Sequence, residues 1–162
     1  MNKGKNQAAR KVLLAAIVFV GAAALLPALA EAQSGPFQYY ALTPCRVADT
    51  RNPNGVNGGP VVVGNGGARN FRIQGNCGVP AGAAAVTLNV TIAGPTGPGF
   101  LTIWPSGGAQ PLVSTINFTT ADAALANGAI VPLSTNTDDL SISFGGSGTV
   151  HVILDVTGYF AP

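Results

Sequence analysis

Apolar residues in this chain recur at every second position, in short runs separated by Gly, Pro and Asn. The clearest run extends from Val86 to Ile92, where Val and Leu or Ile side chains alternate with Thr and Asn. A period of two places the apolar side chains on one face of a strand, whereas an amphipathic helix repeats after about 3.6 residues. The pattern therefore predicts half-buried β-strands.

Similar runs give about eight or nine strands in all. They are Phe37–Leu42, Ala68–Gln74, Val86–Ile92, Leu101–Trp104, Thr115–Phe118, Ala129–Leu133, Leu140–Phe144, Thr149–Val152 and the long, overlapping C-terminal run Val150–Phe160. Only Ala121–Asn127 is compatible with a helix, and it is short. Asn52–Gly67 is too rich in Gly for a regular strand and is expected to be a surface loop.

These strands are not interleaved with helices, which favours two packed antiparallel sheets over an α/β fold. Only 9 % of the residues are charged, and 22 Gly and 12 Pro residues argue against long charged helices and coiled coils. The predicted fold is an all-β antiparallel β-sandwich, in its jelly-roll version.

The first 32 residues have the pattern of a secretory signal peptide. A basic segment is followed by an apolar stretch from Val12 to Leu26, by Pro27, and by two overlapping Ala-x-Ala sites. Cleavage is expected after Ala30 or Ala32, and an uncleaved N-terminal anchor is the alternative. The mature chain would be a single domain over residues 33–162, in the secreted, extracellular or cell-surface compartment.

The signal peptide would remove all three Lys residues and one of the five Arg residues, leaving a mature net charge of about −1. A clustered basic surface is therefore not expected, and neither is nucleic-acid binding. Residues 33–162 also lack an apolar stretch of about 18 residues, so no membrane span is expected after cleavage.

Two cysteines, Cys45 and Cys77, remain in the mature chain. In an exported protein, an even number of cysteines predicts a disulfide. Zinc ligation is the competing interpretation, but two cysteines and one histidine cannot complete a tetrahedral site. We expect a disulfide, and no metal or cofactor.

Six segments resemble a secreted bacterial β-rich domain, without an assigned activity, that recurs in exported and cell-surface proteins of soil bacteria. They carry the pattern CRVxDTR, CGVP, LNVT, LTxWP and DVxGYF. The segments are Leu42–Arg51, Cys77–Pro80, Ala85–Thr91, Gly99–Pro105, Val113–Phe118 and Asp155–Phe160. The resemblance covers most of the mature chain and implies an exported β-rich fold, with no catalytic residue to transfer.

Arg46, Asp49 and Arg51 form the most charged segment of the mature chain, and Asp155 in the last strand could pair with them. Because Arg forms forked hydrogen bonds to carboxylates, these residues predict a structural polar network, with ligand binding as the alternative.

Calcium is a weaker prediction for residues 49–57, where Asp49, Asn52, Asn54 and Asn57 lie close together. The segment lacks the acidic density and the bidentate Glu of a tight calcium site, so ordinary turn chemistry is favoured.

Catalytic motifs are missing from the sequence, and no enzyme is predicted. The only histidine, His151, lies between two valines and is expected to be an ordinary strand residue. Asp138 and Asp139 are adjacent in a polar segment and are expected to form a solvated turn rather than a catalytic pair.

Two functional classes remain. The first is a structural or interaction module that contacts copies of itself or other surface proteins. The alternative is a module that binds polysaccharide or cell wall, whose exposed aromatic residues would stack on sugar rings. The candidate ligand-facing aromatics are Trp104, Tyr39, Tyr40 and Tyr159.

Overall fold

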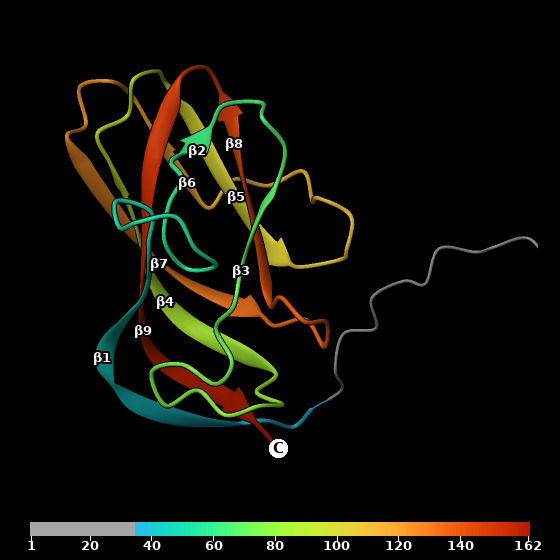
Figure 1. The fold of residues 1–162 in the computed structure, drawn as a ribbon. Coiled ribbons are helices and arrows are strands. Elements are labelled where there is room, and N and C mark those ends of the chain that lie inside the picture. Colours follow the sequence, from blue (N-terminus) through green and yellow to red (C-terminus); the bar gives the residue numbers. More distant parts are fainter. Residues whose placement is uncertain (1–34) are drawn as a thin grey trace, which may run out of the picture.

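The computed structural model describes residues 35–162, which form nine strands in two antiparallel sheets packed face to face (Figure 1). This confirms the predicted all-β sandwich. No helix occurs between residues 35 and 162, and hence none that could cross a membrane. The predicted signal peptide and its cleavage sites lie outside the described residues.

Most of the strands match the alternating runs of the sequence. They are β1 (Gln38–Asp49), β2 (Val62–Val63), β3 (Arg69–Phe71), β4 (Ala85–Ala93), β5 (Gly99–Pro105), β6 (Ile116–Phe118), β7 (Ala124–Pro132), β8 (Leu140–Gly146) and β9 (Thr149–Ala161).

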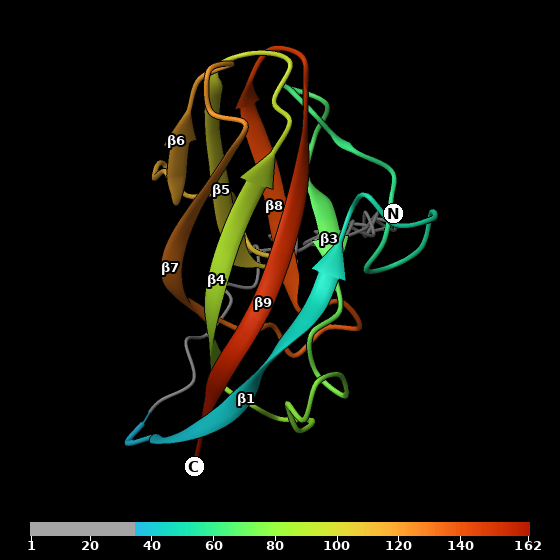
Figure 2. The ribbon, with the colours of Figure 1, turned by 90° about the vertical axis from the view of Figure 1, so that its left-hand side faces the viewer.

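The first sheet has the strand order β1-β9-β4-β7, with β2 also paired to β9, and the second has the order β3-β8-β5-β6 (Figure 2). All of these strand pairs are antiparallel. The jelly-roll version stays a prediction: with the two-residue β2 set aside, eight strands divide four and four between two sheets, as that fold requires.

The core lies between the two sheets, and β4 shows how the sequence builds it. Its even-numbered residues, from Val86 to Ile92, are buried, while the intervening Thr and Asn residues are half-buried on the outer face. From the second sheet, Phe144 packs its ring against Phe118, with 5.2 Å between the ring centroids. Each fully buried side chain of this size contributes about 1.5–3 kcal/mol to folding.

The segment Ala121–Asn127, the one segment compatible with a helix, forms a turn and the start of β7 instead. The carboxylate of Asp122 accepts hydrogen bonds from the backbone N of Thr119 (2.7 Å) and from its hydroxyl (3.0 Å), which fixes a turn. Strand β7 then starts at Ala124 and pairs with β4. A helix of seven residues is marginal on its own, so the strand pairing determines the local structure.

The segment Asn52–Gly67 is a loop, as predicted, apart from the two residues of β2 and two isolated bridges, Asn54 with Gly59 and Gly64 with Phe144. Although this segment is rich in Gly, it has a defined path. Its backbone turns back on itself through hydrogen bonds from Gly55 N to Gly59 O (3.1 Å) and from Gly59 N to Asn52 O (3.0 Å).

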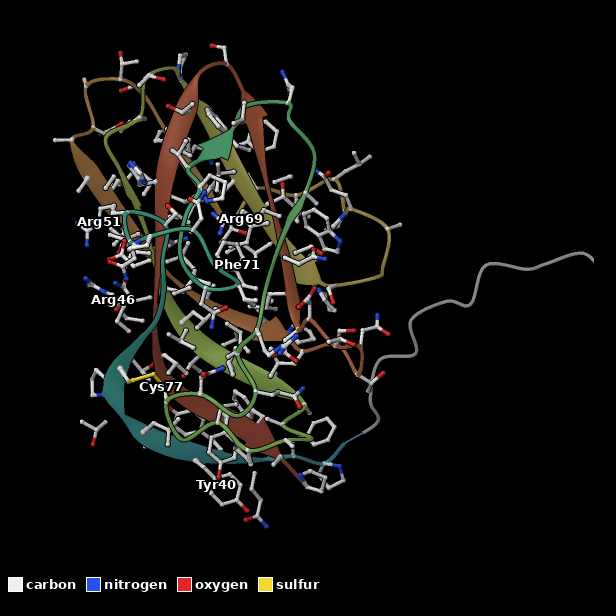
Figure 3. The ribbon with its side chains drawn as sticks, in the orientation of Figure 1. Tyr40, Arg46, Arg51, Arg69, Phe71 and Cys77 are labelled. Carbon is white, nitrogen blue, oxygen red and sulfur yellow. A yellow bond between two sulfur atoms is a disulfide. The ribbon has the colours of Figure 1, made fainter. Side chains whose placement is uncertain are left out.

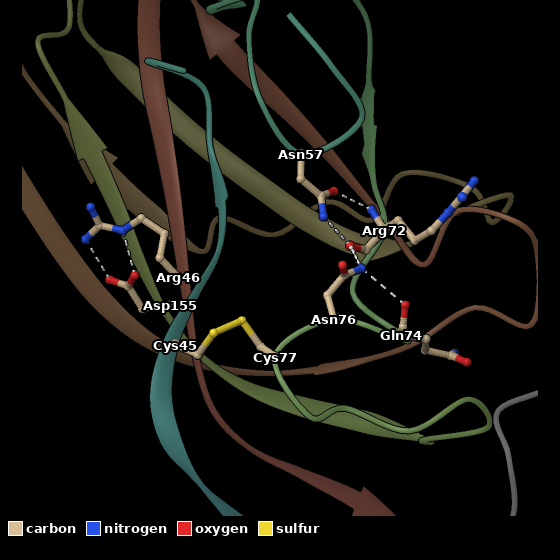
Figure 4. The surroundings of a disulfide bond; sticks show 8 residues. All are labelled: Cys45, Arg46, Asn57, Arg72, Gln74, Asn76, Cys77 and Asp155. Carbon is tan, nitrogen blue, oxygen red and sulfur yellow. Dashed lines mark hydrogen bonds and ion pairs between the residues drawn. A yellow bond between two sulfur atoms is a disulfide. The ribbon is translucent and has the colours of Figure 1, made fainter. Parts of the chain in front are cut away.

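Cys45 and Cys77 form the predicted disulfide, with 5.7 Å between their Cα atoms (Figure 4). Cys45 belongs to β1, and Cys77 lies in the loop that follows β3. At Cys77 the backbone is left-handed (φ 53°), and Gly78 continues in the same region (φ 81°), so the chain turns sharply there. The bond therefore fixes the loop against β1.

Replacing both cysteines by alanine should lower the free energy of unfolding by about 3–4 kcal/mol. The sequence separation of the two cysteines is 32 residues, and the chain-entropy model gives this value for such a loop. Urea denaturation of the oxidised protein and of the double variant would measure the difference. An unchanged midpoint would contradict a stabilising role.

Candidate functional site

The predicted polar network exists, and its first part crosses from β1 to β9. Arg46 and Asp155 are direct partners in the strand register. The Arg46 guanidinium donates from Nε to Asp155 Oδ1 (2.8 Å) and from Nη2 to Oδ2 (3.4 Å), as Figure 4 shows. The antiparallel register thus brings together two residues that are 109 positions apart in the sequence.

Asp49 is the centre of the network and is only 5 % exposed. Arg51 donates to its carboxylate from Nε (2.9 Å), from Nη2 (2.7 Å) and from its backbone N (3.0 Å). Arg46 adds a longer contact of 3.5 Å from its Nη1 to Asp49 Oδ2. The hydrogen bonds from Arg51 lower the pKa of Asp49 from 3.8 to about 2, although burial acts in the opposite direction.

Two of the four candidate calcium ligands, Asp49 and Asn57, already have partners inside the chain. Both carboxylate oxygens of Asp49 accept hydrogen bonds from Arg51. The side chain of Asn57 donates to Arg72 O (2.6 Å) and accepts from Arg72 N (2.8 Å), so it pairs with the backbone as a neighbouring strand would. Calcium would have to displace these donors. Within residues 35–162, no three His, Cys, Asp or Glu residues cluster as metal ligands.

Arg69, which the sequence analysis did not single out, holds the Asn52–Gly67 loop in place. Figure 3 shows its side chain beside Phe71, and the guanidinium lies 4.9 Å from the centre of that ring. The guanidinium donates to backbone carbonyls rather than to a carboxylate. The carbonyls that accept its hydrogen bonds belong to Gly55, Gly58, Gly59 and Pro60. Burial lowers the pKa of Arg69. The position of Arg69 directly after a Gly-rich loop was the available sequence signal.

The prediction that Asp138 and Asp139 both lie in a solvated turn is wrong for Asp139. Asp139 is only 2 % exposed, and its Oδ2 accepts hydrogen bonds from the backbone N atoms of Ile73 and Gln74. It therefore attaches the β7–β8 connection to the segment after β3. Asp138 remains at the surface, 3.6 Å from Arg72 Nη2.

Trp104 does not face a ligand, contrary to its inclusion among the candidate aromatics. It is 7 % exposed, and its indole N–H donates to Gly108 O at 3.1 Å. The β5–β6 loop turns back over this residue and supplies the acceptor that a buried indole needs. The ring therefore offers no face to a sugar.

The tyrosine candidates are nearer the surface, but they pack against their neighbours. Tyr40 stacks on Tyr159 across β1 and β9, with centroids 5.0 Å apart and planes inclined by 14°. Tyr39 lies over Gly158, where an added Cβ would be 2.3 Å from its hydroxyl, and also contacts Phe160. Tyr39 and Tyr40 are 50 % and 38 % exposed, yet each has a ring face covered. These pairs mainly close the end of the β1–β9 ribbon.

Phe100 is a further exposed aromatic residue that the sequence analysis did not select. It is 37 % exposed on β5 and lines an open cleft with a volume of about 410 Å³. The cleft lies between β5, β6 and the loop that joins them. Its lining residues are Phe100, Thr102, Gln110, Pro111, Leu112, Val113, Ser114 and Asn117.

His151 is half-buried on β9, and its Nδ1 lies 3.2 Å from the Thr50 hydroxyl oxygen. The same oxygen accepts a hydrogen bond from Val152 N (2.8 Å). The contact with the imidazole and the bond from Val152 together tie the end of β1 to β9.

Comparison with known proteins gave no match: no family model fits the sequence, and no curated protein or solved structure is significantly similar to it. The functional proposals below therefore depend on the geometry of residues 35–162.

Asp49→Asn should lower the free energy of unfolding at neutral pH and make that free energy change less between pH 4 and pH 2. Because folding lowers the pKa of Asp49, its carboxylate stabilises the fold fully above pH 4 and loses this effect as the pH falls toward 2. The contribution is at most about 2 kcal/mol, since solvent screens the half-exposed arginines. Thermal denaturation from pH 2 to pH 7 would measure it. Asp138→Asn, at the surface, is the control, and identical curves for Asp49→Asn and the wild type would contradict the prediction.

Arg69→Met should loosen the Asn52–Gly67 loop, because the backbone carbonyls lose a charged donor while the methionine retains the aliphatic part. Trypsin should then cleave after Arg51 about tenfold faster or more, as expected for losing hydrogen bonds worth ~1–3 kcal/mol. Mass spectrometry of the native protein during digestion would give the rate. Arg72→Met is the control, since the Asn57 contacts use only the Arg72 backbone. Equal rates would show that Arg69 does not hold the loop.

Proposed function

We propose that the mature chain is an exported, non-catalytic structural or interaction module that works outside the cell or at its surface and associates with copies of itself. A disulfide-bonded all-β domain is compatible with an extracellular location. The resemblance to a secreted β-rich domain is in keeping with this proposal. Its main support is the contrast between β7 and the other strands at the sheet edges.

Strand β1, at one edge of the first sheet, has features that hinder pairing with another chain. Its ladder with β9 is irregular between Ala41 and Cys45 and again between Arg46 and Ala48. It contains Pro44 and the disulfide, and its last residue donates a backbone hydrogen bond to Asn57 O (2.8 Å). Bulges, proline residues and a loop that covers the strand are common features that prevent an edge strand from pairing with another chain.

Strands β3 and β6, at the edges of the second sheet, have three residues each. An edge of that length offers few backbone groups to another strand. Neither is therefore well suited to pair with a partner.

Strand β7, at the other edge of the first sheet, lacks these protections. It has nine residues, no charged side chain, no proline before Pro132 and an uninterrupted ladder with β4. Leu125 and Ile130 are 38 % and 65 % exposed. A long uncharged edge strand with apolar side chains is a template for pairing with another strand.

The ladder also indicates which backbone groups of β7 are available. Backbone bonds from Gly94 N to Ala123 O and from Leu133 N to Ala84 O flank it. Because bonded positions alternate in an antiparallel pair, the even-numbered residues direct their backbone groups away from β4. Within residues 35–162, no hydrogen bond reaches these outward groups. They belong to Ala124, Ala126, Gly128 and Ile130.

A second copy of the chain is a suitable partner for this edge. Two β7 strands related by a twofold axis run antiparallel, so outward N–H and C=O groups of one strand can meet those of the other. Their side chains are small or apolar and carry no charge, so the pairing involves no charge repulsion. The proposed contact is therefore an extended sheet that crosses two copies.

Light scattering on the oxidised protein over a concentration series should show a mass that rises to a dimer or higher. Ile130→Lys should weaken this association at least tenfold. Association would bury the exposed isoleucine, which is worth about 1.5–3 kcal/mol for a full burial, and the substitution places a charged side chain there on each strand.

Val63→Lys is the matched control, because Val63 is also an exposed β-branched strand residue, at 51 %, but lies on β2. It should leave the mass unchanged. A monomer at every concentration, or equal effects of the two lysines, would reject association through β7.

A further inference from the structure

The open cleft beside Phe100 lies outside the β7 edge and has a lining fixed by the fold. The loop between β5 and β6 is yellow in Figure 1. Three of the hydrogen bonds that attach it to β5 involve residues at or next to the cleft lining. Thr102 donates its hydroxyl to Val113 O (2.7 Å), Thr115 N donates to Leu101 O (2.7 Å), and Ile103 N donates to the Thr115 hydroxyl (3.2 Å). The cleft is thus bounded by an anchored loop.

Phe100 supplies the aromatic wall, and a glycine on β8 makes its position available. Gly145 is its direct partner in the strand register, and a Cβ added there would lie 2.3 Å from the ring Cζ. The ring therefore covers Gly145, while its exposed part lines the cleft together with Pro111. Tyr40 differs, because its ring is stacked on another tyrosine.

The polar part of the cleft consists of neutral side chains. Asn117 Nδ2 donates to the Ser114 hydroxyl oxygen (3.1 Å), which leaves Asn117 Oδ1 as an acceptor and the Ser114 hydroxyl proton as a donor. Gln110 has no side-chain hydrogen bond within residues 35–162 and is exposed beside them. No Asp, Glu, Lys or Arg lines the cleft.

These features select the chemistry of a ligand. A site with no charged side chain cannot compensate a charged ligand, whereas amides and hydroxyls both donate and accept, as sugar hydroxyls do. The aromatic wall matches the apolar C–H face of a sugar ring. We propose that the cleft binds a neutral pyranose unit of a polysaccharide, with the ring against Phe100 and its hydroxyls on Gln110 and Asn117. The site is independent of association through β7.

Nuclear magnetic resonance titration of the oxidised protein with cellohexaose, chitohexaose and maltohexaose would test the proposal. At least one of them should shift the backbone resonance of Phe100 and the side-chain amides of Gln110 and Asn117. Phe100→Ala should weaken the binding at least tenfold, because the sugar ring loses the aromatic wall on which its apolar face stacks. Gln110→Ala, at an exposed position, should weaken it less and provides a variant expected to remain folded.

Tyr40→Ala is the matched control, because Tyr40 is as exposed as Phe100 and lies outside the cleft. It should retain the affinity.

The proposal is rejected if none of the three oligosaccharides shifts these resonances, if Tyr40→Ala removes binding and Phe100→Ala does not, or if hexagalacturonate, which is charged, binds more tightly. Shifts that follow protein concentration without sugar would instead assign the cleft to a contact between copies. The Ile130→Lys variant should bind sugar normally, so the two proposals can fail separately.

Discussion

The pairing of β9 with strands on both sides is the constraint on which the first sheet depends. β9 bonds to β1 and β4, and its first residues also pair with β2. These partners lie far from it in the sequence, so their contacts must overcome a large loss of chain entropy before the core is complete. The register matters equally, because a slip of one residue would exchange the buried and exposed faces of the strand. The Arg46–Asp155 pair and the stacked tyrosines exist only in the observed register.

The few charges of the described domain are used mostly within it. Arg46 and Arg51 bind aspartates, Arg69 binds backbone carbonyls, and Arg72 donates to Thr137 O (3.1 Å). These charged groups are therefore largely paired, and none of them lies on β7 or lines the Phe100 cleft. This one property connects both proposals, since it leaves the β7 edge without a repelling side chain and the Phe100 cleft without a preference for ions.

The sequence predicted the parts of the structure that depend on local pattern. The alternation in Val86–Ile92 was sufficient to place β4, and an even cysteine count in a chain predicted to be exported was sufficient for the disulfide. The segment Ala121–Asn127 forms no helix because pairing with β4 outweighs the preference of an Ala-rich segment. The burial of Asp139 was missed because its partners, Ile73 and Gln74, are more than 60 residues away in the sequence.

The candidate sites also divide into those that neighbouring residues predict and those that depend on contacts distant in the sequence. The network at Asp49 was predictable because Arg46 and Arg51 are close neighbours in the sequence. In contrast, no pattern in the neighbouring sequence distinguishes Trp104, which is buried, from Phe100, which lines a cleft. Both lie on β5 at even positions, and the difference arises where the β5–β6 loop crosses the strand.

The pairing of Gln38 with Ala161 has a geometrical consequence for how the domain would be displayed. The start of β1 and the end of β9 lie at the same end of the sandwich, as Figures 1 and 2 show. The turns after β4 and β8 lie at the opposite end, where Thr149 N donates to the Thr96 hydroxyl oxygen (2.7 Å). A segment joined to either end of the domain would therefore be connected at the same end of the sandwich. The long axis of the sandwich would then point away from that connection, and its sides, including β7 and the Phe100 cleft, would be accessible to a partner.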